Sequence, residues 1–148
     1  MTTAQGVRDQ WNAHARKEND VKFWKFEAPA EEQIESVIDT GGLPPSVTVP
    51  GLLNMYEDVA KKLRPGDGVV LATLMGEEGK IVAFGKVRAV AKELDGISIQ
   101  WAKASHGVYP TGSGLTHWKN KTAFEIKAAP AERYGLLRFI DFHIKEAA

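Results

Sequence analysis

The sequence predicts a single α+β domain in which a mostly antiparallel sheet curls into a small β-barrel with flanking helices. The chain has 148 residues, which fits one domain with one core, and no repeat or long linker divides it. Helical spacing comes early in the chain and strand alternation comes late, which is typical of an α+β fold. A barrel is expected because closure hides the edge strands of such a sheet.

The first third of the chain predicts two helices around one strand. Residues 3–16 have helical spacing, so residues 1–20 are expected to form a helical extension of the domain at 1–148. Residues 21–26 (VKFWKF) predict a short aromatic strand. A second helix is expected to begin at Pro29, with acidic residues in its first turn, and to end at Gly41.

The rest of the chain predicts one more helix and then strands. Residues 43–50 (LPPSVTVP) are expected to be a loop, because each of three prolines fixes φ and removes a donor. Residues 51–63 return to helical spacing. Strands are expected at residues 69–75, 80–90, 97–101, 122–128 and 137–145.

Glycines and prolines predict the connections. Gly76–Gly79 and Asp95–Gly96 are expected to form hairpin turns, with Gly85 as a bulge in the strand between them. Residues 104–116, with three glycines and a proline, are expected to be a loop, and residues 130–135 one helical turn.

The charge balance excludes a protein that coats nucleic acid by net charge alone, because 19 basic residues offset 19 acidic ones. Gly96–Phe124 nevertheless contains three lysines and no carboxylate, which predicts a local positive face. The longest apolar run, Val69–Met75, is far shorter than the roughly 20 residues of a membrane helix. The absence of cysteine and of a signal-peptide pattern at the N-terminus indicates a cytoplasmic protein.

Catalytic and metal-binding patterns are not found in the sequence. Ser113 lies between two glycines but lacks the flanking pattern of a nucleophile elbow, and no phosphate-binding loop follows it. The four histidines have no metal-ligand spacing. We therefore expect no enzyme activity, no metal and no cofactor.

Aromatic residues are the strongest remaining signal. Trp101, Tyr109 and Trp118 lie in or beside the stretch without carboxylates, and Trp24 lies in the first strand. Aromatic faces hold an extruded base by stacking, at about 1–3 kcal/mol per base. Neighbouring lysines would hold the phosphates without reading sequence. The alternative is that the tryptophans fill the core.

Short motifs along residues 21–90 resemble a known family. The strand FWKF comes first, Gly51-Leu52-Leu53-Asn54 then begins a helix, and Lys62–Asp67 (KLRPGD) ends it. Val69–Leu71 and Ile81–Val87 (IVAFGKV) follow as strands. This order resembles the EVE domain of the PUA-like superfamily, which is related to the YTH domains.

The resemblance implies a PUA-like fold and a non-catalytic reader of modified DNA or RNA. By position, Trp24 would be a wall of an aromatic cage, Asn54 a hydrogen-bond partner of the base edge, and Thr73 part of the floor. The composition adds three aromatic residues to the ligand site and three lysines to a phosphate site. These additions are Trp101, Tyr109 and Trp118 for the ligand, and Lys103, Lys119 and Lys121 for phosphate.

The sequence therefore predicts a non-catalytic nucleic-acid-binding module that reads a modified or flipped base in an aromatic pocket. Its partner would be DNA or RNA, and no membrane is involved. One alternative is a protein-interaction or regulatory module on a PUA-like scaffold, favoured by the aliphatic strand at Val70–Thr73. Another is a binder of a nucleoside-like small molecule, because a tryptophan cage also holds a cation or a nucleoside.

Overall fold

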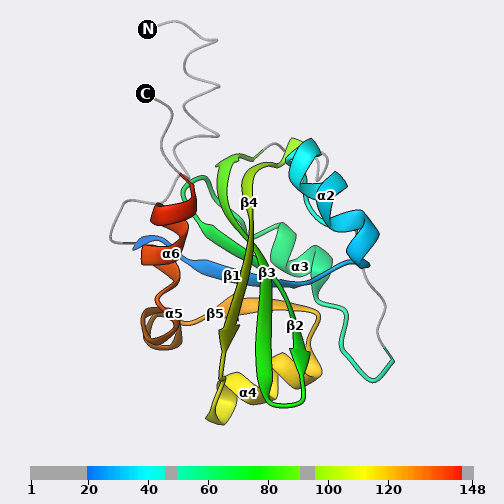
Figure 1. The fold of residues 1–148 in the computed structure, drawn as a ribbon, viewed down its shortest axis with the longest axis vertical. Coiled ribbons are helices and arrows are strands. Elements are labelled where there is room, and N and C mark those ends of the chain that lie inside the picture. Colours follow the sequence, from blue (N-terminus) through cyan, green and yellow to red (C-terminus); the bar gives the residue numbers. More distant parts are fainter. Residues whose placement is uncertain (1–19, 46–49, 91–95, 145–148) are drawn as a thin grey trace, which may run out of the picture.

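The computed structural model describes residues 20–45, 50–90 and 96–144 (Figure 1). The strands are β1 (Phe23–Glu27), β2 (Gly68–Met75), β3 (Glu78–Ala89), β4 (Ser98–Val108) and β5 (Ala123–Ile126). The helices are α2 (Glu31–Thr40), α3 (Tyr56–Ala60), α4 (Gly112–Asn120), α5 (Ala128–Tyr134) and α6 (Leu136–His143). The helix predicted at residues 3–16 lies outside the described residues, as do Asp95 of the second predicted turn and residue 145.

The strands form one mixed sheet in the order β4-β3-β2-β1-β5. β1 pairs parallel with β2, whereas the other three pairings are antiparallel. The connection between the two parallel strands contains α2 and α3, which gives the crossover the length that parallel pairing requires. The predicted α+β fold is confirmed. The described sheet is open, with β4 and β5 at its ends, so it does not show the predicted barrel.

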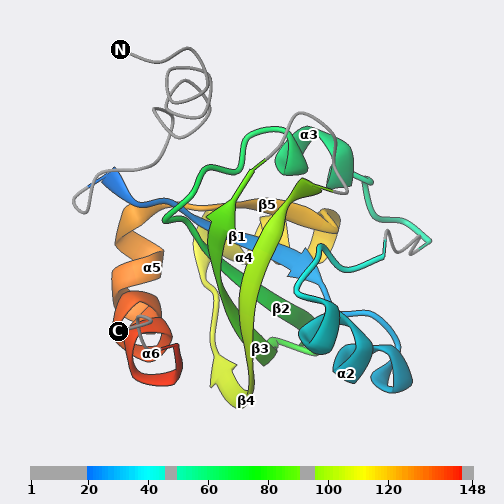
Figure 2. The same cartoon turned by 90° about the horizontal axis from the view of Figure 1, so that it is seen from above.

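Helices cover both faces of the curved sheet, with α2 on one side and α5 and α6 on the other (Figure 2). Leu71 of β2 packs with Val37 of α2 in one core cluster. Its neighbour Val70 points to the opposite face and packs in a second cluster with Trp118 of α4 and Ile140 of α6. Successive strand residues point to opposite faces, so a sheet covered on both sides needs near-continuous apolar strands. The run GVVLATLM in β2 meets this requirement.

Asp67 connects the start of β1 to the turn that precedes β2. Its carboxylate accepts hydrogen bonds from the Trp24 indole at 2.9 Å, from the Arg64 backbone N–H at 3.1 Å and from the Lys22 backbone N–H at 3.2 Å. Asp67 is fully buried, so these donors replace the water that the carboxylate loses on folding. The predicted turn at Pro65-Gly66-Asp67 therefore also sets the parallel register of β1 and β2, in which Phe23 pairs with Gly68.

The prediction of a strand at residues 137–145 is wrong, because residues 136–143 form α6. Leu136 and Ile140 are buried on one side of this helix, with the i, i+4 spacing of a helix face. Gly135 adopts a left-handed conformation with φ 70°, which ends α5 and allows a new helix to start. Five apolar residues in eight fit both periodicities, so the alternation around Phe142 was not specific to a strand.

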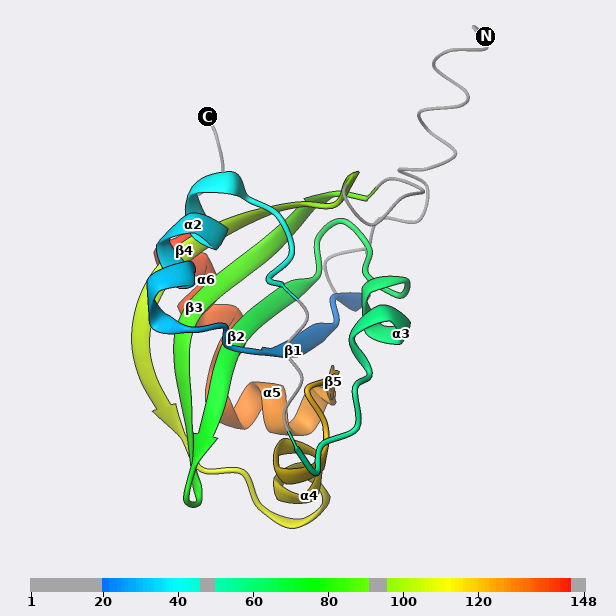
Figure 3. The same ribbon diagram turned by 90° about the vertical axis from the view of Figure 1, so that its right-hand side faces the viewer.

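The prediction of a loop at residues 104–116 is also wrong at both ends. β4 continues to Val108, and α4 begins at Gly112. The extra length of β4 follows the long partner strand β3, which pairs Gly79 with Val108. The β2–β3 hairpin lies at the same end of the fold as α4 (Figure 3). Gly79 of this hairpin lies against the ring of Trp118 in α4, and a Cβ there would meet that ring at 2.9 Å.

Two smaller predictions are also corrected. The helix predicted at residues 51–63 is shorter and spans Tyr56–Ala60. Gly85 is not a bulge, because it pairs in regular register with Val69 and Trp101. A Cβ at Gly85 would lie 2.6 Å from the Trp101 ring, so the glycine makes room for the indole. None of the helices in the described ranges is long and apolar enough to cross a membrane.

Substitution of the buried carboxylate tests its role in the fold. We expect Asp67→Ala to lower the free energy of unfolding by about 2–4 kcal/mol, because three donors lose their acceptor in the core. The exposed control Asp39→Ala should change it by no more than about 0.5 kcal/mol. Denaturant unfolding measures both variants. An equal decrease in the free energy of unfolding of Asp67→Ala and Asp39→Ala would contradict the structural role of Asp67.

Candidate functional site

The structure places the three predicted tryptophans in the core. Trp24 is 2% exposed, and its indole N–H is held by Asp67. Trp101 donates its indole N–H to the carbonyl of Gly42 at 2.9 Å. Trp118 packs edge-on against Phe124, with ring centroids 6.0 Å apart. The three rings therefore stabilise the fold and do not face one another as the walls of an open cage.

Tyr109 and Asn54 lie on the surface. Tyr109 is 68% exposed, and its hydroxyl donates to the carboxylate of Glu78 at 3.1 Å, which raises the pKa of the tyrosine. The side-chain oxygen of Asn54 accepts hydrogen bonds from the Tyr56 backbone N–H at 3.2 Å and from the Thr122 hydroxyl at 3.4 Å. Asn54 thereby connects the start of α3 to the residue before β5.

The remaining predicted site residues form two groups in different parts of the fold. Thr73 and Lys103 line a pocket of about 450 Å³ between α2 and the sheet, which we call the α2 pocket. Trp24 and Lys121 line a smaller groove of about 190 Å³ beside β5, which we call the β5-edge groove. Lys119 is exposed near the end of α4. The structure thus separates the predicted phosphate-binding lysines.

Basic side chains from four parts of the chain line the β5-edge groove. Lys62 follows α3, His117 lies in α4, and Lys121 and Lys127 flank β5. A backbone bridge positions Lys121, because the N–H of Leu53 donates to Asn120 at 2.8 Å and that of Thr122 donates to Leu53 at 3.1 Å. Lys62 and Lys127 were not predicted as site residues, because they lie outside the stretch without carboxylates.

The basic residues of the β5-edge groove affect the pKa of His117. Burial lowers the pKa of His117, and the charges of Lys121 and Lys127 lower it further. Its ring lies 5.4 Å from that of Phe124. Glu125 is the acidic residue of the groove lining, and it forms an ion pair with Lys127 at 3.3 Å. The groove is therefore a local positive site on a protein of zero net charge.

A buried lysine lies between the sheet and α4. Lys25 of β1 has no exposed surface, and its Nζ is 2.6 Å from a carboxylate oxygen of Glu27. The same Nζ lies 5.3 Å from the centroid of Trp118 and 5.9 Å from that of Phe124. Burial lowers the pKa of Lys25, and the nearby Glu27 carboxylate opposes this effect. Opposite charges two residues apart in a strand were the available sequence signal, because such residues share a face.

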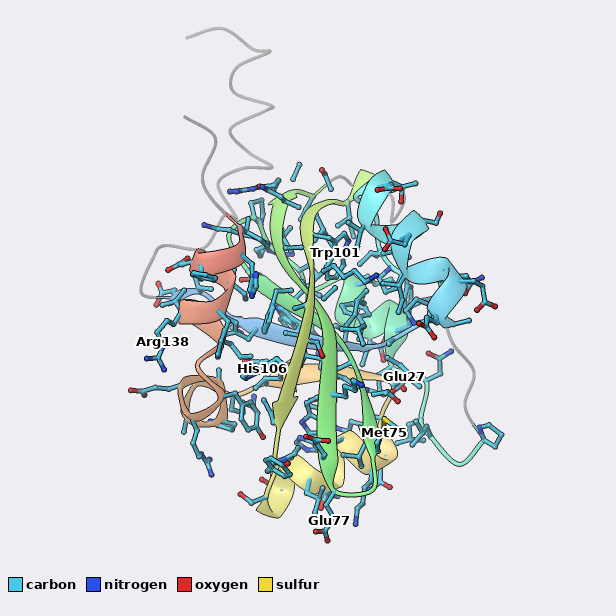
Figure 4. The ribbon with its side chains drawn as sticks, in the orientation of Figure 1. Glu27, Met75, Glu77, Trp101, His106 and Arg138 are labelled. Carbon is cyan, nitrogen blue, oxygen red and sulfur yellow. The ribbon has the colours of Figure 1, made fainter. Side chains whose placement is uncertain are left out.

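The described histidines pack against aromatic rings. His106 of β4 lies 4.1 Å from the ring of Phe139 in α6, and His143 stacks on Phe84 at 5.6 Å. Figure 4 shows His106 on the side of β4 that faces α6, and Trp101 beside α2. Over residues 20–45, 50–90 and 96–144, no group of three or more His, Asp or Glu side chains is placed to hold a metal ion.

Comparison with known proteins gives no match to a family model, to a curated protein or to a solved structure. The candidate sites are therefore defined by their geometry alone.

The buried lysine predicts a specific pH dependence of stability. Because the pKa of Lys25 is below its usual value of 10.5 in the folded state, the unfolded chain binds more protons at high pH. The free energy of unfolding of the wild type should therefore rise, relative to Lys25→Met, as pH increases through the folded-state pKa towards 10.5. Denaturant unfolding over this range measures the difference, with Lys22→Met as the exposed control. Parallel curves for wild type and Lys25→Met would refute the assignment.

Proposed function

We propose that this chain is a non-catalytic nucleic-acid-binding module whose β5-edge groove holds the phosphate backbone. The observation that carries the proposal is the convergence of Lys62, His117, Lys121 and Lys127 on one groove. Phosphate oxygens are the acceptors that such flexible ammonium groups bind as point charges. Among the described residues that line the groove, the one carboxylate is that of Glu125, and it is already paired with Lys127.

The affinity of this groove is expected to come mainly from phosphate contacts. Trp24 lines the groove, but only 2% of the residue is exposed, so it offers little surface for a stacked base. Lysine–phosphate contacts release counterions and do not depend on sequence. The module would therefore bind single strands of DNA and RNA with strong salt dependence.

The finer parts of the proposal come from the resemblance to EVE domains. They are a PUA-like scaffold, recognition of a modified or flipped base and a cytoplasmic location. The open mixed sheet with helices on both faces is compatible with such a scaffold. A panel of oligonucleotides with common base modifications tests the recognition of a base.

A second candidate function is a protein-interaction module. α6 exposes two large apolar side chains, with Leu137 52% and Phe142 72% exposed. Exposed apolar patches mark interaction sites when they are contiguous. This candidate is favoured if the chain shows no salt-dependent binding of nucleic acid.

Removal of two groove lysines tests the proposed phosphate site. We expect Lys121→Ala/Lys127→Ala to weaken binding of single-stranded oligonucleotides of all sequences alike. The slope of log K against log salt should become shallower by about 1.4, which is roughly 0.7 for each lost phosphate contact. Fluorescence anisotropy at several salt concentrations gives both quantities for DNA and for RNA.

A single-charge control separates the effect of the groove from that of net charge. Arg138→Ala removes one positive charge from α6, where the side chain points away from the sheet (Figure 4). It should leave the salt slope unchanged. If this variant and the double lysine variant weaken binding to the same extent, the β5-edge groove is not the binding site.

Protonation of His117 should strengthen binding. Its pKa in the free protein is lowered below 6.5, and a bound phosphate would raise it, so binding takes up protons. Affinity is therefore expected to increase as pH falls from the higher pKa of the complex through the lower pKa of the free protein. The change should disappear in His117→Gln and persist in His143→Gln. A pH profile that His117→Gln does not alter would contradict a phosphate next to this ring.

A further inference from the structure

The α2 pocket is a second concave site that the proposed nucleic-acid site does not use. α2 contributes Glu31 and Ile34 to it, and strands β2, β3 and β4 contribute Thr73, Lys80 and Lys103. Its volume of about 450 Å³ lies in the range of small-molecule sites, roughly 300–1,000 Å³. An ion pair connects the helix to the sheet beside the pocket, with the Nζ of Lys103 in β4 2.8 Å from the carboxylate of Glu35 in α2.

The charged residues of the α2 pocket leave one anion and one cation on opposite walls. Lys103 forms an ion pair with Glu35. The hydrogen bond to Glu35 raises the pKa of Lys103, and the negative charge of Glu31 raises it further. Glu31 stands on the helix wall and forms no ion pair with any described residue. Lys80 stands on the sheet wall and likewise has no ion-pair or hydrogen-bond partner among the described residues. Both are exposed, so they belong to the rim of the pocket.

Between the two charged walls the lining is apolar, with a hydroxyl beside the lysine. Pro29 and Ile34 are buried on the helix side, and Val82 is half-buried on the sheet. Thr73 lies directly opposite Lys80 in the β2–β3 register, so the two side chains stand on the same face of the sheet. Lysine and threonine donors together suit a carboxylate, and the Glu31 carboxylate suits an ammonium.

We propose that the α2 pocket binds a short apolar peptide with free termini, of about the size of a dipeptide. The peptide ammonium group lies at Glu31, its carboxylate lies at Lys80 and Thr73, and its side chains cover Ile34 and Val82. An extended chain gains at most about 3.3–3.6 Å per residue, so a dipeptide holds its ammonium and carboxylate groups apart at its two ends. A mononucleotide or free phosphate lacks the cationic end that Glu31 would bind. This site is independent of the proposed nucleic-acid function.

Three probes of nearly equal size test the proposal. They are leucyl-leucine, N-acetyl-leucyl-leucine, which lacks the ammonium group, and leucyl-leucine amide, which lacks the carboxylate. Methyl NMR spectra of the full chain report binding at Ile34 and Val82 and show that each variant is folded. We expect the wild type to bind leucyl-leucine about fivefold more tightly than either blocked peptide, as partly exposed charge pairs allow.

The two rim charges should each control one end of the peptide. In Glu31→Gln, leucyl-leucine and its N-acetyl form should bind equally, and in Lys80→Gln, leucyl-leucine and its amide should bind equally. The exposed controls Glu32→Gln and Lys61→Gln, which lie outside the pocket lining, should keep the wild-type preference. Absence of methyl shifts with leucyl-leucine, or equal binding of the three probes to the wild type, would overturn the proposal. Nucleic-acid binding by the same samples is measured separately, so the two proposals fail independently.

Discussion

The buried carboxylate of Asp67 is the contact on which the arrangement of β1 depends. A parallel pair such as β1 and β2 has no tight turn to set its register, since its strands are joined by a long crossover. Asp67 helps to fix this register, because its carboxylate accepts hydrogen bonds from residues on both sides of the pair, including the indole N–H of Trp24. The same hydrogen bond draws Trp24 into the core. The buried ring therefore stabilises the fold and is not exposed as a wall of the predicted aromatic cage.

β1 also contains a second buried interaction, the ion pair between Lys25 and Glu27. Lys25 points to the face opposite Trp24, so the two faces of one short strand hold a buried indole and a buried ammonium group. A buried ion pair contributes little net stability, but the loss of one partner is costly because it leaves an uncompensated charge. The interior around β1 therefore tolerates few substitutions. The strand also adjoins both candidate sites, because Trp24 lines the β5-edge groove, and Ala28 and Pro29, which directly follow the strand, line the α2 pocket.

Sequence patterns predicted the elements whose signals are local. The helix predicted from Pro29 to Gly41 is confirmed as α2, although it begins at Glu31, and the hairpin predicted after Met75 is confirmed between β2 and β3. Acidic first-turn residues and a glycine turn were the local signals. α6 was mistaken for a strand because its apolar residues satisfy both periodicities, and only packing against β3 decides between them. The β5-edge groove could be predicted only in part. Lys121 stood out in its stretch without carboxylates, whereas Lys62 and Lys127 join it through the fold, from positions that no local pattern connects.

Although the chain has zero net charge, its two candidate sites differ in local charge. Interactions between exposed charges are largely screened beyond about 10 Å at 0.1 M salt, so a ligand senses the groups of its own site and not the total. The β5-edge groove has an excess of cations, whereas the α2 pocket pairs Lys103 internally and leaves one charge of each sign at its rim. An anion is favoured at the first site and a zwitterion at the second. The charged groups that make this distinction lie outside the hydrogen bonds and the ion pair that hold β1, so binding at either site can be altered without breaking these interactions.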